Sequence, residues 1–119
     1  MLERVLKIYE KHSSEQKGFI YAEMAKVQKK QEQLDKAIAL QQQAIEYFES
    51  LEKYQNSEVT AELLCTLGQW QEAKKNIDES LMSFQKAYEI YEQLYGLEDR
   101  DTVRVKRNIA YVLLRGRQY

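Results

Sequence analysis

Apolar side chains recur along this sequence at the spacing of one face of an α-helix. Leu2, Val5, Leu6 and Tyr9 follow the i, i+3, i+4, i+7 pattern. The pattern returns in five further segments, near residues 19–27, 37–48, 63–70, 81–91 and 109–113. Stripes of this width are typical of helices that bury one face against a neighbour. The pattern therefore predicts an all-α fold of about six helices.

Short polar breaks separate these stripes, near residues 12–15, 31–34, 55–58, 75–78 and 95–99. The break at 55–58 resembles a helix cap, and Gly96 is placed to stop a helix. The chain has no Pro and only 4 Gly, so few residues could close tight turns, and an all-β fold is excluded. Connections this short favour antiparallel packing of successive helices.

Two sets of landmarks repeat with one period. Leu34-Asp35 and Ile77-Asp78 begin matching segments 43 residues apart, and Ala44 and Ala87 begin another pair with the same separation. Met24-Ala25, Leu67-Gly68 and Ile109-Ala110 form a second aligned set, 43 and 42 residues apart. Because independent landmarks share this period, the sequence predicts a repeated helical hairpin of about 40 residues.

These landmarks resemble the tetratricopeptide repeat. Leu64-x-x-Leu67-Gly68 is similar to the signature of the first helix in that family, and Ser80…Phe84…Ala87 to that of the second. The period exceeds the family's usual length of about 34 and resembles the kinesin light chain type of repeat. The sequence departs from the family in having Met24-Ala25 for Leu-Gly, Gln41 for an aromatic residue, and no Pro. The resemblance implies a right-handed α-solenoid of antiparallel hairpins.

The repeat register divides residues 1–119, taken as one domain, into four parts. Residues 14–53 and 57–95 match full hairpins, residues 1–12 match a second helix without its first, and residues 99–116 match a first helix without its second. A repeat buries its core by stacking on its neighbours. We therefore expect a fragment of a longer array. The alternative is a small protein whose end helices pair with another copy or a partner.

Composition excludes several function classes. Lys plus Arg is 18 and Asp plus Glu is 19, so the net charge of −1 gives no electrostatic case for binding nucleic acid. With 1 Cys and 1 His, we expect no metal site, cofactor or catalytic residue. No apolar stretch is long enough for membrane insertion, and the lone Cys suits a cytoplasmic, reducing setting.

Three kinds of residue that could suggest a site have a simpler structural interpretation. Cys65 lies in the middle of a predicted helix and is expected to be a small buried apolar residue. Trp70 extends an apolar stripe and is expected in the core. Tyr88, Tyr91 and Tyr95 are expected to pack between helices with their hydroxyls in water.

The family resemblance implies a binding site on the concave surface lined by the first helix of each hairpin. Carried over to this sequence, that surface contains Ala22, Glu62, Cys65 and Glu72, together with the residues of our candidate peptide-binding groove: Lys26, Lys29, Lys30, Gln69, Arg104, Arg107, Asn108, Tyr111 and Arg115. Arg107, Tyr111 and Arg115 share one helix face. Because Arg matches carboxylates well, an acidic or C-terminal peptide is the expected ligand. Ordinary solvated charges on exposed helices are the alternative.

The sequence thus predicts a non-catalytic scaffold for protein–protein interaction that holds a peptide or partner helix in a concave groove. The alternative is a self-assembling module whose end helices pair with another copy or with a neighbouring subunit of a motor, ciliary or signalling complex.

Overall fold

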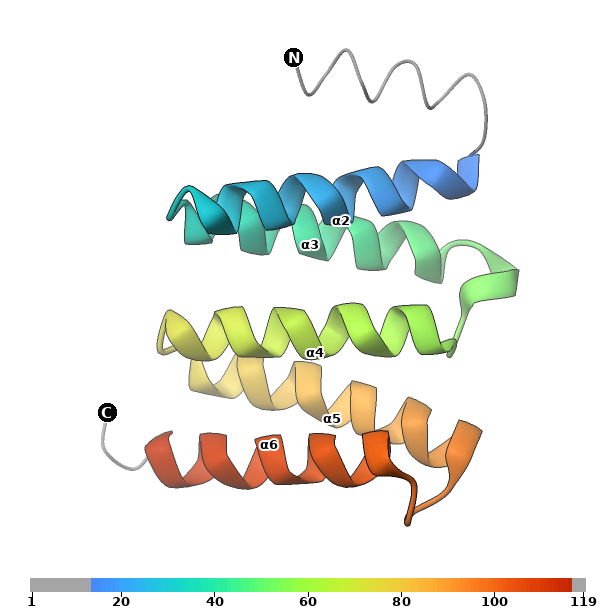
Figure 1. Cartoon of the computed structure of the whole chain (residues 1–119), viewed down its shortest axis with the longest axis vertical. Helices are drawn as coiled ribbons and strands as arrows, with labels where there is room; N and C mark the ends of the chain where they lie inside the picture. The colour runs from blue at the N-terminus through green and yellow to red at the C-terminus, as the bar shows by residue number, and fades with distance from the viewer. Residues whose placement is uncertain (1–13, 117–119) are drawn as a thin grey trace. The chain divides into compact units, whose positions relative to one another are not determined.

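Four of the five predicted breaks fall between successive α-helices of the computed structural model, which describes residues 14–116 (Figure 1). The break predicted near residues 55–58 marks the start of the following helix, whereas the preceding α-helix already ends at Glu49. These residues form five α-helices, one short 3-10 helix (η1) and no strand, which confirms the all-α fold. The predicted helix at residues 1–12 lies outside the described residues. The elements are α2 (Ser14–Lys30), α3 (Leu34–Glu49), η1 (Glu52–Tyr54), α4 (Glu58–Ala73), α5 (Ile77–Tyr95) and α6 (Arg100–Gly116).

The chain divides into two compact units, Met1–Gln55 and Asn56–Tyr119. In the first unit α2 packs along α3, and in the second α5 packs against both α4 and α6 (Figure 1). Each pairing joins helices that follow one another along the chain, as expected from the short connections.

Local signals in the sequence determine several helix ends. The Ser57 side chain accepts a hydrogen bond of 3.3 Å from the backbone N–H of Thr60 and so caps α4. Gly96 ends α5 with φ +91°, a conformation that L side chains rarely adopt, which confirms its predicted role as a helix stop. Glu32 and Lys75, also with positive φ, follow the ends of α2 and α4.

Small residues let the helices of the second unit approach closely. Gly68 of α4 lies against the ring of Phe84 of α5. The Ser80 hydroxyl donates a 2.7 Å hydrogen bond to the Gly68 carbonyl, and the Ser83 hydroxyl donates one of 2.6 Å to the side chain of Gln71. All five residues are buried, so this contact joins the repeat signature to the core of the hairpin.

The first unit has a comparable contact built from other residues. Gly18 of α2 lies against the ring of Phe48, which is fully buried and packs edge-on against Phe19 and Tyr54 with ring centroids 4.9 Å away in both cases. Tyr54 thereby holds η1 against the hairpin. Ala25 and Gln41, two of the departures from the repeat pattern, are 0% and 2% exposed, so both belong to the core.

Helix α6 buries only one of its faces. Thr102, Val105 and Val112 are buried, and Gly116 lies close to Ile77 at the start of α5. α6 therefore runs antiparallel to α5. A neighbouring apolar stripe on α6 stays exposed, with Val103, Leu113 and Leu114 at 37%, 53% and 59%.

Candidate functional site

Most of the predicted groove residues lie on one face of the second unit, formed by α4 and α6. We call this surface the α4–α6 face; from α4 it contains Glu62, Cys65, Gln69 and Glu72, and from α6 it contains Asp101, Arg104, Asn108, Tyr111 and Arg115. Each set follows helical spacing, so its members share one side of their helix. The exposed residues of the face are polar or aromatic, and Cys65 is buried behind them.

An ion pair between Arg115 and Glu72 connects the two helices across this face. The Arg115 Nε donates a short hydrogen bond to Glu72 Oε2, and Nη2 donates a second, of 2.9 Å, to Oε1. The same guanidinium lies 5.8 Å from the ring centroid of Tyr111. The two-pronged geometry orients Arg115, and Glu72 neutralises its charge.

The other end of the face has more accessible cations. Arg104 lies 3.4 Å from Asp101 one turn earlier, and its side chain is 52% exposed. Arg107 is exposed at the edge of the face, and Asn108, one turn after Arg104, is partly buried. On α4, Glu62 and Gln69 are exposed. A solvent-exposed pair such as Arg104–Asp101 contributes little stability, so Arg104 can exchange this partner for a ligand carboxylate.

Buried groups behind the face show no sign of chemical activation. Cys65 is 7% exposed, and burial raises the pKa of its thiol to about 11. A thiol with so high a pKa is protonated near neutral pH and is a poor nucleophile. The structure thus confirms Cys65 as a buried residue, and Trp70, 8% exposed, also lies in the core as predicted.

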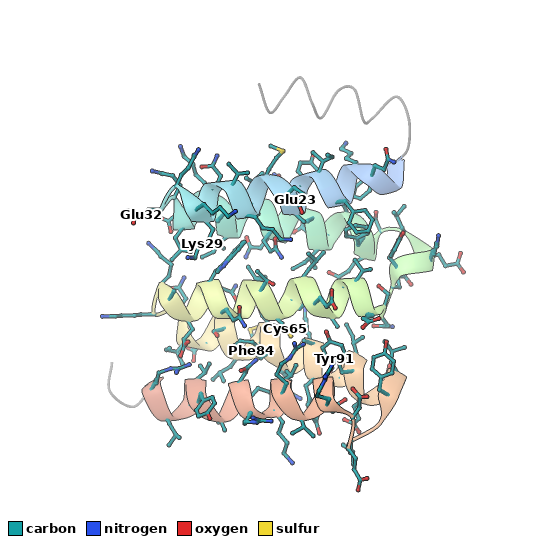
Figure 2. All side chains as sticks on the ribbon, viewed as in Figure 1. Glu23, Lys29, Glu32, Cys65, Phe84 and Tyr91 are labelled. Atoms are coloured by element: carbon teal, nitrogen blue, oxygen red, sulfur yellow. The ribbon has the colours of Figure 1, made fainter. Side chains whose placement is uncertain are left out.

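Tyr91 corrects one prediction. Its side chain is 0% exposed, and its hydroxyl makes no hydrogen bond to any described residue, so this hydroxyl does not reach water. Burial raises the pKa of Tyr91, with smaller contributions from Cys65 and Glu62. Cys65, Phe84 and Tyr91 all lie among the helices of the second unit (Figure 2). Position 91 follows Phe48 by one 43-residue period, and both rings are core residues.

The neighbouring tyrosines behave as predicted. Tyr88 is partly buried, and Tyr95 is 45% exposed and stacks on Tyr91 with ring centroids 6.2 Å apart. A hydrogen bond with Glu58 raises the pKa of Tyr95. These two side chains combine packing with access to water.

Three predicted groove residues, Lys26, Lys29 and Lys30, belong to the first unit. All are exposed on the last two turns of α2 (Figure 2 labels Lys29). Lys26 lies 3.4 Å from Glu23, and Lys29 and Lys30 occupy the last turn, where positive charge stabilises a helix end. The structure therefore brings together six of the nine candidate residues, those on α4 and α6.

Sequence reasoning missed the pairing of Glu72 with Arg115. These residues lie 43 positions apart, one repeat period. Opposite charges at this separation, on helices expected to be neighbours, were a usable signal.

Two further observations concern metal sites and membrane-spanning helices. Across residues 14–116, no group of three His, Cys, Asp or Glu side chains could hold a metal ion. Within the same residues, no helix has the length and apolar character to cross a bilayer.

Comparison with known proteins agrees with the observed architecture. The model of the tetratricopeptide repeat family matches residues 59–119, about half of the chain. The crystal structure of BtubC (BKLC) from P. vanneervenii is similar over 84% of this chain, with a TM-score of 0.75 and 16% sequence identity. This chain spans 39% of that protein, and at such identity the likeness concerns the fold alone. No curated protein matches the sequence significantly. The chain belongs to the tetratricopeptide repeat family.

Proposed function

We propose that this chain is a non-catalytic peptide-binding scaffold whose α4–α6 face takes part in recognition. Members of its family generally mediate protein–protein interactions. The observation that carries the proposal is the row formed by the exposed Arg104, the partly buried Asn108 and the exposed Tyr111 on α6, beside the exposed Glu62 and Gln69 on α4. A surface with charged, amide and aromatic side chains can bind a peptide by ion pairs, backbone hydrogen bonds and ring contacts.

The cations of α6 favour an acidic side chain or a C-terminal carboxylate as the group recognised. Arg104 and Arg107 are both exposed, and guanidinium groups match carboxylates with two parallel hydrogen bonds. Arg115 already has Glu72 as its partner, so its role is to hold Tyr111 in place. Lys26, Lys29 and Lys30 are exposed on the first unit, and taken by themselves they would favour acidic ligands for the same reason.

The test is a binding titration with labelled ten-residue acidic peptides, each made with a free and with an amidated C-terminus. Arg104→Glu should weaken binding of the best peptide at least about tenfold, because it replaces an attraction by a repulsion. Lys86→Glu is the matched control, since it makes the same charge change at an exposed position of α5. Equal effects of the two variants would show that net charge alone drives binding and would contradict the proposal.

A second candidate function rests on the exposed apolar stripe of α6. Its residues support contacts between the end helix and another copy or a neighbouring subunit, in a motor, ciliary or signalling complex of the cytoplasm. The molecular mass in solution, measured by sedimentation over a wide concentration range, tests self-association. A mass that grows with concentration supports pairing between copies, and a constant monomer mass excludes it.

A further inference from the structure

Two buried hydroxyl groups of the second unit have no hydrogen-bond partner among the described residues. Tyr91 of α5 is 0% exposed and Thr102 of α6 is 1% exposed, and neither hydroxyl bonds to any residue within 14–116. Burying a hydroxyl without a hydrogen bond is costly, so buried hydroxyls are normally bonded to protein or to ordered water. These two groups therefore indicate a further hydrogen-bonding partner inside the fold.

The register of α5 against α6 brings the two residues to the same level. Gly116 lies against Ile77, and the two helices run antiparallel. Tyr91 lies 14 residues after Ile77, and Thr102 lies 14 residues before Gly116. Because both helices rise equally per residue and 14 residues make about four turns, each residue returns to the side of its helix that makes this contact. Tyr91 and Thr102 therefore face one another across the α5–α6 packing.

The preceding repeat satisfies its corresponding threonine locally. Thr60 precedes Thr102 by 42 residues, and its hydroxyl oxygen lies 3.3 Å from that of Ser57 in a hydrogen bond. The counterpart of Ser57 is Asp99, whose carboxylate instead accepts a 2.9 Å hydrogen bond from the backbone N–H of Asp101. Thr102 thus lacks the local partner that Thr60 has.

Tyr91 differs from its own counterpart in a matching way. One period earlier the chain has Phe48, which is an equally buried ring without a hydroxyl. The second unit therefore has an additional hydroxyl on α5 at the level where the threonine of α6 has no local partner. The two differences together create a polar pair within an otherwise apolar interface.

Cys65 of α4 supplies a third group near this pair. Burial is the largest cause of the raised pKa of Tyr91, and the Cys65 thiol is the next. Burial also raises the pKa of Cys65, while Arg104, two residues after Thr102, lowers it. The thiol is a weak hydrogen-bonding group that can complete the surroundings of a small polar molecule.

We propose that an internal water molecule binds between α5 and α6 and bridges the hydroxyls of Tyr91 and Thr102. Solvent does not reach either group, so this water is one enclosed by folding. A buried water makes about three hydrogen bonds, which the two hydroxyls and the Cys65 thiol can supply. All three groups are uncharged at neutral pH, so they would not compensate a buried ion.

The bridge joins the first turn of α6 to the last turns of α5. Asp101 and Arg104 of the α4–α6 face lie on either side of Thr102 in the sequence, so the water helps to fix the helix end that presents them. The inference concerns the support of this face and does not depend on the proposed function.

The stability of three variants tests the bridge. Tyr91→Phe and Thr102→Val each remove one hydroxyl and keep the shape of the side chain. Each should lower the midpoint of thermal unfolding by about 3–6 °C, because the remaining groups of the bridge lose a hydrogen bond. The double variant removes both ends of the bridge, so it should lose less than the sum of the two single variants.

Thr66→Val and Tyr88→Phe are the matched controls, since they make the same changes of atoms outside the proposed site. Thr66 is partly buried on α4 and donates its hydroxyl to the Glu62 carbonyl within its own helix, and Tyr88 is partly buried on α5. Each control should change the unfolding midpoint by less than about 2 °C.

A crystal structure that shows ordered water would locate the molecule directly. We expect one water within hydrogen-bond distance of Tyr91 Oη and Thr102 Oγ1, and none there in the double variant. A direct hydrogen bond between the two hydroxyls would overturn the proposal. A higher unfolding midpoint for either single variant would also overturn it, because removing an unpaired buried hydroxyl is stabilising. Strictly additive losses would show that the two hydroxyls share no partner.

Discussion

Gly68 of α4 lies so close to Phe84 of α5 that a Cβ atom at position 68 would come within 2.9 Å of two carbons of the ring. The carbonyl oxygen of Gly68 accepts a hydrogen bond from the Ser80 hydroxyl. Phe84 is 2% exposed, so its ring has little room to move away. The small residue of the repeat signature is therefore required by the distance between two helices.

Gly68→Ala should destabilise the protein although Ala is the better helix former. Overpacking a buried contact costs about 1–3 kcal/mol, and the helix gains about 1 kcal/mol from replacing Gly. We expect the free energy of unfolding to fall by about 1 kcal/mol in urea denaturation. Phe84→Leu should relieve the clash, so the double variant should lose less stability than the sum of the two single variants. Strict additivity would contradict the contact.

Glu32 offers the opposite change, a substitution by Gly that should stabilise. Its φ of +61° is costly for a residue with a Cβ atom, and the N–H groups of Glu32 and Gln33 bond to the carbonyls of Lys29 and Gln28 to close the end of α2. Glu32→Gly should raise the free energy of unfolding by about 0.5–1 kcal/mol. Glu32→Ala removes the same charge but keeps the Cβ atom. If thermal unfolding shows equal effects, the backbone explanation is wrong.

Burial of Cys65 predicts a loss of stability in alkaline solution. Its pKa is raised from 9.0 to about 11 in the folded chain, so the folded state favours the neutral thiol. Stability from this group is complete below pH 9 and is lost as the pH rises toward 11, because the unfolded chain releases its proton first. Between pH 9 and pH 11, the free energy of unfolding falls by up to about 1.4 kcal/mol per pH unit.

Comparison of variants isolates this contribution. Urea denaturation of the native chain and of Cys65→Ala, measured from pH 8 to pH 11, should give a shallower decline for the variant above pH 9. Tyr91→Phe is the control, since the pKa of Tyr91 is raised from 10.0 and its contribution begins later. Parallel declines for the native chain and Cys65→Ala would mean that the thiol is not buried in solution.

Much of the fold could be predicted from sequence because its determinants are local or periodic. Gly96 and Ser57 mark helix ends through their own backbone or side-chain chemistry, and Gly68 and Phe84 were recognisable by their spacing. The depth of Tyr91 was not predictable in this way. Helical spacing places it on an inward face but does not say whether its hydroxyl reaches water.

The sequence predicts which residues share a helix face at the candidate site, but it does not predict the ion pair between Glu72 and Arg115. Arg104, Asn108 and Tyr111 share one side of α6, since 3.6-residue periodicity determines direction, and their role in binding stays a prediction. The repeat period offers Glu72 as a candidate partner of Arg115, but whether the two side chains meet depends on the distance between α4 and α6, which the pattern along either helix does not contain. The three lysines of α2 belong to the other compact unit, so the grouping of all nine residues stays a prediction.

Glu72 therefore gives the sharpest test of how the α4–α6 face works. Glu72→Gln removes the carboxylate that neutralises Arg115, so the guanidinium becomes available to a ligand. The stability cost should stay below about 1 kcal/mol, because Arg115 is half exposed. If the face binds acidic peptides, affinity for the best peptide should rise about three- to tenfold in the binding titration.

Glu62→Gln is the matched control for this prediction. It removes the same charge from the same face without releasing Arg115, so it measures the effect of net charge alone. A gain with Glu72→Gln that does not exceed the gain with Glu62→Gln would exclude Arg115 from recognition and leave Arg104 and Arg107 as the cations of the site.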